Sequence, residues 1–338
     1  MRHSLFLLPL IGVALVAGCS SRQSSETNTP APATQTAPAA AAGDYKVALL
    51  TTGPVTDKGW NQSAYEGLQQ IAKDLGAKTA NQENLQPNQF EEAFRDYANQ
   101  GYSIVIGHGD EFNDAAMKVA KDYPKTFFVT TGGAHSAANV IPVIFSAEEG
   151  CYLQGMEAGM LSKTGKGGFV GGQQLPNVKS AADAFGLGAK AVNPKFVFQQ
   201  TYIGNWSDVA AAKGQTVALL SNGCDVISQN CDAAAKGVFD AAGSKPNTYT
   251  FGANSDQNSM APNVFSSFIL DVPKALDDVA KQIKAGTAQG APLVLGLKSG
   301  DIRLLDNPKF ASVLTADQKA TLAKTTQDIE DGKVKVKS

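Results

Sequence analysis

The chain has 338 residues, with 29 Lys and Arg against 31 Asp and Glu, and a formal net charge of −2. Its basic residues are scattered, which excludes the clustered positive charge of a nucleic-acid-binding protein or a polybasic membrane patch. Three histidines and four cysteines show no metal-ligand spacing, and no cofactor fingerprint is present. We therefore expect no metal, no cofactor and no nucleic-acid partner.

The N-terminus has the features of a bacterial lipoprotein signal. Arg2 and His3 form a short basic region, and residues 5–16 form an apolar run that is too short to span a bilayer. The run leads into VAGC, in which small residues precede Cys19. We expect residues 1–18 to be a signal peptide and Cys19 to carry a lipid that anchors the protein to a bacterial membrane, facing the periplasm or the cell exterior. The alternative is an ordinary signal peptide with an incidental cysteine.

Residues 20–43 consist mainly of Ser, Thr, Ala, Pro and Gln, with almost no large apolar side chain. Such a segment cannot bury enough surface to offset the entropy lost on ordering. We therefore expect the lipidated cysteine and a disordered tether over residues 19–43. The chain from residue 44 onward is long enough for two domains.

Between Tyr45 and Ser146 short apolar runs alternate with amphipathic patterns. The predicted strands are 46–53, 77–80, 103–109, 125–133 and 139–146, and the predicted helices are 61–75, 87–101 and 113–124. Because the strands are almost continuously apolar and are separated by helices, the pattern predicts a parallel sheet covered on both faces.

The same alternation starts again after Glu148. The predicted strands are 167–173, 196–204, 224–230 and 247–254, the predicted helices are 151–163, 178–192, 208–223 and 231–243, and residues 264–286 read as a strand followed by a helix. The fold class is therefore α/β, with two doubly wound parallel-sheet lobes around a ligand cleft. We expect residues 44–147 plus about 265–290 in the N-terminal lobe, and 148–264 plus about 291–338 in the C-terminal lobe.

Polar and aromatic residues collect just after the predicted strands, where ligands of open α/β sheets bind. The segments concerned are TDKGWN (56–61), GHGDEF (107–112), GNWSD (204–208), SQN (228–230) and NSDQ (254–257). Both tryptophans, Trp60 and Trp206, fall in this set, one in each half of the chain. Two aromatic rings surrounded by amide and carboxylate groups suit a flat, hydrogen-bonding heterocycle or a sugar ring.

Several of these residues also have a structural interpretation. Asp57 and Asp208 are equally well placed to cap the helices that follow them, Asp256 to form a turn, and the two tryptophans to pack between lobes. No Ser or Cys nucleophile motif accompanies His108, so we expect this histidine to bond the backbone.

Three cysteines remain beyond the predicted signal peptide and its lipidation site. In an oxidising compartment Cys224 and Cys231 form either a disulfide that closes a small loop or, like Cys151, small apolar fillers of the core.

In the order and spacing of its motifs the chain resembles the basic membrane protein family, also called PnrA-like. Over residues 45–338 these motifs are TDKGWNQSAYEGL, GHGDEFNDA, YIGNWSD, GCDVIS and NSDQNSMAP, the last followed by VFSSFILDV. The family consists of lipoprotein solute receptors of ABC transporters with the type I periplasmic-binding-protein fold. The resemblance implies that fold, a purine-like small-molecule ligand, an ABC permease as partner and no enzymatic activity.

Characterised members of this family hold purine nucleosides between two aromatic side chains. The resemblance implies that Trp60 and Trp206 sandwich the base, that Asn61 reads its edge and that Asp256 accepts hydrogen bonds from ribose hydroxyls. Together with the polar residues at the strand ends, the candidate ligand-binding residues are Asp57, Trp60, Asn61, Asp110, Trp206, Asn230 and Asp256.

The chain departs from the family pattern at two positions of this candidate site. Leu270 stands where the family usually has a lysine that holds the ribose, and Asp110 stands where phenylalanine is common. Without that lysine we expect a weaker preference for nucleosides over nucleobases. Two alternatives to a transport receptor stay open: a sensor or surface lipoprotein of the same fold without a transporter, and a periplasmic hydrolase that uses His108 with Asp110 or Glu111.

Overall fold

The structure, a computed structural model, describes residues 45–57 and 59–336. The predicted signal peptide, Cys19 and the predicted tether lie outside these residues. Along the described part of the chain, no helix combines the length and the apolar character that crossing a bilayer requires.

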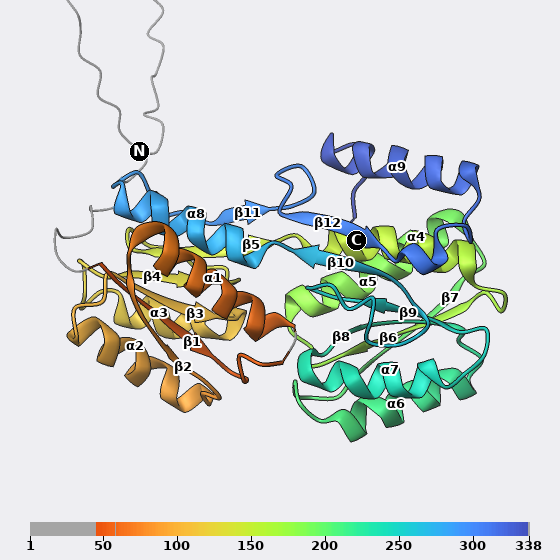
Figure 1. Cartoon of the computed structure of the whole chain (residues 1–338), viewed down its shortest axis with the longest axis horizontal. Helices are drawn as coiled ribbons and strands as arrows, with labels where there is room; N and C mark the ends of the chain where they lie inside the picture. Colours follow the sequence, from red (N-terminus) through yellow and green to blue (C-terminus); the bar gives the residue numbers. More distant parts are fainter. Residues whose placement is uncertain (1–44, 58, 337–338) are drawn as a thin grey trace, which may run out of the picture. The chain divides into compact units, whose positions relative to one another are not determined.

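The first lobe is a six-stranded sheet in which every strand pairing is parallel (Figure 1). Its strand order is β11-β5-β4-β3-β1-β2. The strands are β1 (Lys46–Thr51), β2 (Lys78–Gln82), β3 (Ile104–His108), β4 (Phe127–Thr130), β5 (Val140–Phe145) and β11 (Leu293–Leu295). The apolar runs that predict β1, β3 and β4 are buried throughout or nearly so, as expected for strands covered on both faces.

Helices cover both faces of this sheet. They are α1 (Trp60–Leu75), α2 (Phe90–Asn99), α3 (Asn113–Val119) and α8 (Val272–Lys284), with two short 3-10 helices, η1 (Pro87–Gln89) and η2 (Asp110–Phe112). Leu68 and Ile71 of α1 share one hydrophobic cluster with Leu276 of α8, whereas Phe94 of α2 and Phe112 of η2 belong to another. Phe112 is therefore a core residue.

The second lobe repeats this plan with the strand order β12-β10-β9-β8-β6-β7. Its strands are β6 (Lys166–Gly171), β7 (Val197–Tyr202), β8 (Val226–Asn230), β9 (Tyr249–Gly252), β10 (Val264–Leu270) and β12 (Ile302–Asp306), of which β12 runs antiparallel to β10. Its helices are α4 (Ala147–Leu161), α5 (Pro176–Val192), α6 (Val209–Ser221), α7 (Ala235–Gly243) and α9 (Ala316–Glu330), with η3 (Asp232–Ala234) and η4 (Pro308–Phe310). The predicted α/β fold with two parallel-sheet lobes is confirmed, and it is the type I periplasmic-binding-protein arrangement.

The structure divides the C-terminal third of the chain between the lobes differently from the sequence-based boundaries. β10 pairs with β9 and β12 in the second sheet, although residues from 265 were expected in the first lobe. β11 pairs with β5 in the first sheet, although residues from 291 were expected in the second lobe. Among the described residues, the first lobe thus contains 45–57, 59–145 and 272–295, and the second contains 147–270 and 302–336. The reason is that strand pairing decides which sheet a strand joins, and a local apolar pattern does not encode the partner.

The predicted disulfide is not formed. Cys224 and Cys231 are free, buried thiols in the same hydrophobic cluster. They flank the five-residue strand β8, and an extended strand rises ~3.3 Å per residue, so their Cα atoms are held too far apart for a disulfide. The alternative interpretation, small apolar fillers of the core, is the correct one.

Candidate ligand-binding site

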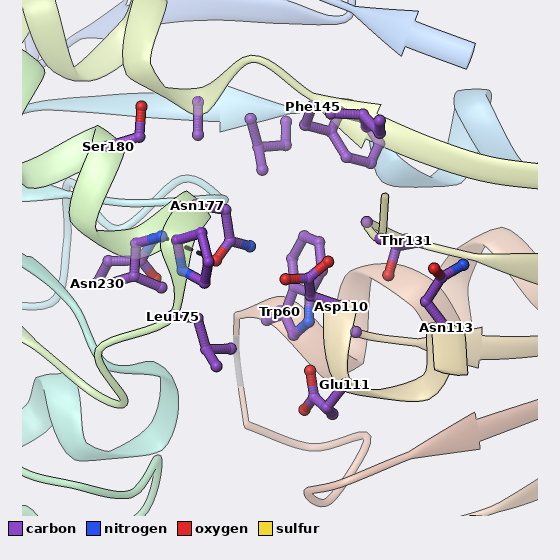
Figure 2. Close-up of a pocket in the computed structure, with 18 of the residues that line it drawn as sticks. Trp60, Asp110, Glu111, Asn113, Thr131, Phe145, Leu175, Asn177, Ser180 and Asn230 are labelled. Carbon is purple, nitrogen blue, oxygen red and sulfur yellow. Dashed lines mark hydrogen bonds between the residues drawn. The ribbon is translucent and has the colours of Figure 1, made fainter. Parts of the chain in front are cut away.

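A cavity of about 620 Å³ lies at the carboxyl ends of the strands of both sheets. From the first lobe it is lined by, among others, Thr52, Trp60, Asp110, Glu111, Thr131 and Phe145. From the second lobe it is lined by, among others, Leu175, Asn177, Trp206, Asn230, Asp232 and Asn254. Figure 2 shows Asp110 and Glu111 near Trp60, with Asn177 and Asn230 on the side of the second lobe. This volume is in the range of small-molecule binding sites.

Trp60 is the first residue of α1, and one face of its indole is covered by protein. The ring stacks on His108 with a centroid separation of 4.0 Å and an interplanar angle of 25°. It also makes a T-shaped contact with Phe145, with the ring centroids 6.4 Å apart. Because this packing fixes the plane of the indole, its remaining surface is presented to the cavity in a defined orientation.

His108 supports this tryptophan from the end of β3. It is fully buried, and burial lowers its pKa to about 3, so the imidazole is neutral. Its Nε2 lies 2.9 Å from the carbonyl oxygen of Trp60 and therefore donates, while its Nδ1 accepts from the Thr131 hydroxyl at 2.9 Å. The expected backbone-bonding role of His108 is confirmed.

Trp206 reaches the same cavity from the loop after β7. The ring rests on Gly172, where an added Cβ would lie only 2.1 Å from Cε3, so no larger residue fits beneath it. Trp206 and Leu175 both pack against a small hydrophobic cluster that contains Val178. Its carbonyl accepts a hydrogen bond from the backbone N–H of Ala234 at 3.1 Å, which ties this loop to η3. Like Trp60, Trp206 is half-buried and firmly supported by the protein.

Asp57 and Asn61 stabilise the start of α1. The Asp57 carboxylate accepts from the backbone N–H groups of Gly59, Asn61 and Gln62 at 2.9 to 3.0 Å, and from Asn61 Nδ2 at 2.8 Å. Three of its four hydrogen-bond donors are therefore backbone N–H groups at the start of the helix, which have no acceptor within the helix itself, as in a capping interaction. Neither side chain is among the residues that line the cavity. Asp208 likewise caps α6, by accepting from the N–H of Ala211.

The loop after β9 places a different residue in the cavity from the one expected. Asp256 is exposed, accepts from the backbone N–H of Asn258 at 3.0 Å and does not line the cavity. Asn254 of the same loop does line it, with a left-handed φ of 68° that asparagine tolerates. Its Nδ2 donates to Asn230 Oδ1 at 3.4 Å. Asn254 follows the strand end more closely than Asp256, which is the signal that sequence reasoning missed.

Carboxylates give the cavity its charge. Asp110, Glu111 and Asp232 line it, as do Asp114 and Glu148, and no Lys or Arg is found among its described lining residues. Burial raises the pKa of the first three carboxyl groups. Within the described residues no group of three or more His, Cys, Asp or Glu side chains is arranged to hold a metal ion. Sequence reasoning had selected Asp110 but not Glu111 as a ligand contact, and not Asp232.

Two lobes of this topology with a cavity at their strand ends define the type I periplasmic-binding-protein fold. A solute-binding protein of an ABC transporter system from Aeropyrum pernix K1 has the same fold, with a TM-score of 0.79 and 20% sequence identity over 86% of this chain and 92% of that one.

Residues 45–337 match the family described as ABC transporter substrate-binding protein PnrA-like, and the chain belongs to that family. It is 31% identical to the ABC transporter nucleoside-binding protein BmpA of Lactococcus lactis subsp. cremoris, over 98% of this chain and 97% of that relative. It is 29% identical to a purine-binding protein of Brucella abortus, over 77% of this chain and 74% of that relative. The chain is thus a substrate-binding protein of the ABC transporter type.

Proposed function

We propose that this protein is the solute receptor of an ABC importer and that its ligand is a purine nucleoside or a related purine-like compound. The observation that carries the proposal is that Trp60 and Trp206, each supported by its own lobe, line a single cavity. A planar heterocycle is the ligand that two such rings hold best, because stacking adds to the burial of both faces. The names of two relatives, nucleoside-binding and purine-binding, support this ligand class.

The remaining lining residues are consistent with a ligand that is read by hydrogen bonds. Asn230, Asn254 and Asn177 offer amide groups that both donate and accept, which suits the ring nitrogens and exocyclic groups of a purine. Leu270 closes part of the wall with an apolar side chain that is 5% exposed. An apolar wall where the family usually places lysine favours a reduced preference for the sugar over the free base.

The hydrolase alternative is disfavoured by the state of His108. Both of its ring nitrogens are engaged in hydrogen bonds within the protein, and the ring is buried beneath Trp60. A general base must reach the proton that it removes, and this imidazole does not line the cavity.

In the proposed transport cycle the ligand enters the open cleft, the lobes close on it by hinge bending at the crossover segments, and an ABC permease receives the closed form. We also propose that Cys19 is lipidated and holds the receptor to a bacterial membrane, facing the periplasm or the cell exterior. The VAGC sequence after a short apolar run supports this anchor.

Calorimetric titration with adenosine, guanosine, adenine and ribose tests the ligand class. We expect one-to-one binding of the purine compounds and none of ribose alone. Binding of ribose with no binding of any purine would contradict the proposal. Chromatography of the titrated mixture distinguishes a receptor, which leaves the nucleoside intact, from a hydrolase, which releases the base.

A further inference from the structure

The corresponding 3-10 helices of the two lobes each place a carboxylate at the cavity. β3 and β8 are each the fourth strand in the order of their sheet, and each is followed by a one-turn 3-10 helix, η2 and η3. Glu111 lies in η2, Asp232 is the first residue of η3, and both side chains line the cavity. The fold thus brings one acidic side chain from each lobe to the same ligand space.

The local backbone around Glu111 accommodates its carboxylate. Gly109 has a φ of 149°, and an added Cβ at this position would lie 2.4 Å from Glu111 Oε2. A side chain at position 109 would therefore displace the carboxylate from its place beside the cavity. Burial raises the pKa of Glu111, and the neighbouring Asp110 adds to this effect.

Asp232 lies at the cavity wall, and its carboxylate accepts no hydrogen bond from the described residues. It adopts a left-handed φ of 49°, which aspartate tolerates better than most residues. Burial raises its pKa, and the negative charges of Asp57 and Glu111 raise it further, while no hydrogen bond from the described residues stabilises its charged form. The negative charge of Glu111, which belongs to the other lobe, therefore acts on Asp232.

No positive charge among the described lining residues compensates this pair, and Leu270 lines the cavity as an apolar side chain. A ligand group with N–H or O–H donors, above all a cationic one, would form charge-assisted hydrogen bonds with these carboxylates. An anionic group would be desolvated next to like charges.

We propose that Glu111 and Asp232 form a carboxylate pair, one from each lobe, that selects the ligand by the charge of its substituents. The pair favours a cationic or donor-rich group and rejects an anionic one. This inference rests on the proposed function, since it concerns the same cavity and assumes a purine ring between the two tryptophans.

The test uses three ligands that share one ring and differ in charge at one position: adenosine, 5′-amino-5′-deoxyadenosine and adenosine 5′-monophosphate. Because a nucleoside fills much of a cavity of this size, we expect a charge at its 5′ position to interact electrostatically with the carboxylate pair. We expect the wild-type protein to bind the amine at least as tightly as adenosine and the monophosphate at least tenfold more weakly. In Glu111→Gln/Asp232→Asn the affinity ratio of amine to monophosphate should fall at least tenfold.

The matched control is Asp240→Asn, which removes one carboxylate from an exposed ion pair with Lys236 on α7 of the second lobe. It should leave the affinity ratio unchanged, and thermal unfolding of each variant verifies that it is folded. If the double variant still binds adenosine and has the same affinity ratio as wild type, the proposed role of the carboxylate pair is wrong and the proposed function stands. Failure of wild-type protein to bind adenosine or either derivative overturns the proposed function and the pair with it.

Discussion

Removal of either tryptophan is the most direct perturbation of the candidate site. In Trp60→Ala the ligand loses a ring whose opposite face rests on His108 at 4.0 Å, and the histidine is left beneath an unfilled space. Trp206→Ala removes the corresponding ring that rests on Gly172. Because both rings are held by the protein before the ligand arrives, their loss reduces binding without a compensating gain in ordering entropy.

The magnitude follows from stacking and burial. Aromatic stacking contributes about 0.5–1.5 kcal/mol beyond the buried area. If roughly 50 Å² of each indole covers the ligand, its burial contributes ~1.2 kcal/mol at about 25 cal/mol per Å². We therefore expect each alanine variant to bind a purine nucleoside at least tenfold more weakly, which corresponds to about 1.4 kcal/mol.

Calorimetry with adenosine measures the loss, and intrinsic fluorescence provides a second readout because the chain has only two tryptophans. The matched controls Trp60→Phe and Trp206→Phe keep an aromatic face and should retain most of the affinity. Thermal unfolding verifies that the alanine variants are folded. Tight binding that survives both alanine substitutions would refute the stacking model.

Four further predictions follow from the anchor, the fold and its buried groups. Cys19→Ser should accumulate as uncut precursor or be released in soluble form, and a variant that still fractionates with membranes and carries lipid would contradict lipidation. Saturating ligand should lower the radius of gyration in solution scattering, whereas an unchanged profile would count against hinge closure. Cys224 and Cys231 should both react with an alkylating reagent after denaturation without reductant, because both thiols are free, and a species that needs reductant first would show a disulfide. Burial raises the pKa of Glu157, in α4, from 4.5 in the unfolded chain to about 8. Its contribution to the free energy of unfolding is therefore complete below pH 4.5 and is lost as the pH rises towards 8. The loss is at most about 1.4 kcal/mol per pH unit. Glu157→Gln should weaken this decline in chemical denaturation at several pH values, and parallel curves for variant and wild type would refute it.

Short sequence patterns predicted most of the strands and helices, because apolar runs and helical periodicity are properties of neighbouring residues. The run SIVIGHG predicts a strand over residues 103–109, and β3 spans Ile104–His108, since an apolar run between polar helices has to be buried on both faces. The same logic predicted where a ligand would bind. Trp60 and Trp206 follow strand ends, and strand ends of parallel sheets meet at one edge. The sequence alone was therefore sufficient for the fold class and for the two aromatic residues of the candidate site.

Other features depend on contacts between distant segments and on the direction of individual side chains. β11 joins the first sheet through pairing with β5, which is remote in sequence, and β10 pairs with β9 and β12 in the second sheet. Whether Asn254 or Asp256 faces the cavity depends on loop dihedral angles that composition does not reveal.

The sequence by itself determined two α/β lobes and the place of the two tryptophans, because apolar periodicity and strand ends are encoded locally. Only the tertiary structure brought Glu111 and Asp232 to one cavity from opposite lobes. Distances between residues far apart in the chain arise from strand order and packing, which no short segment specifies.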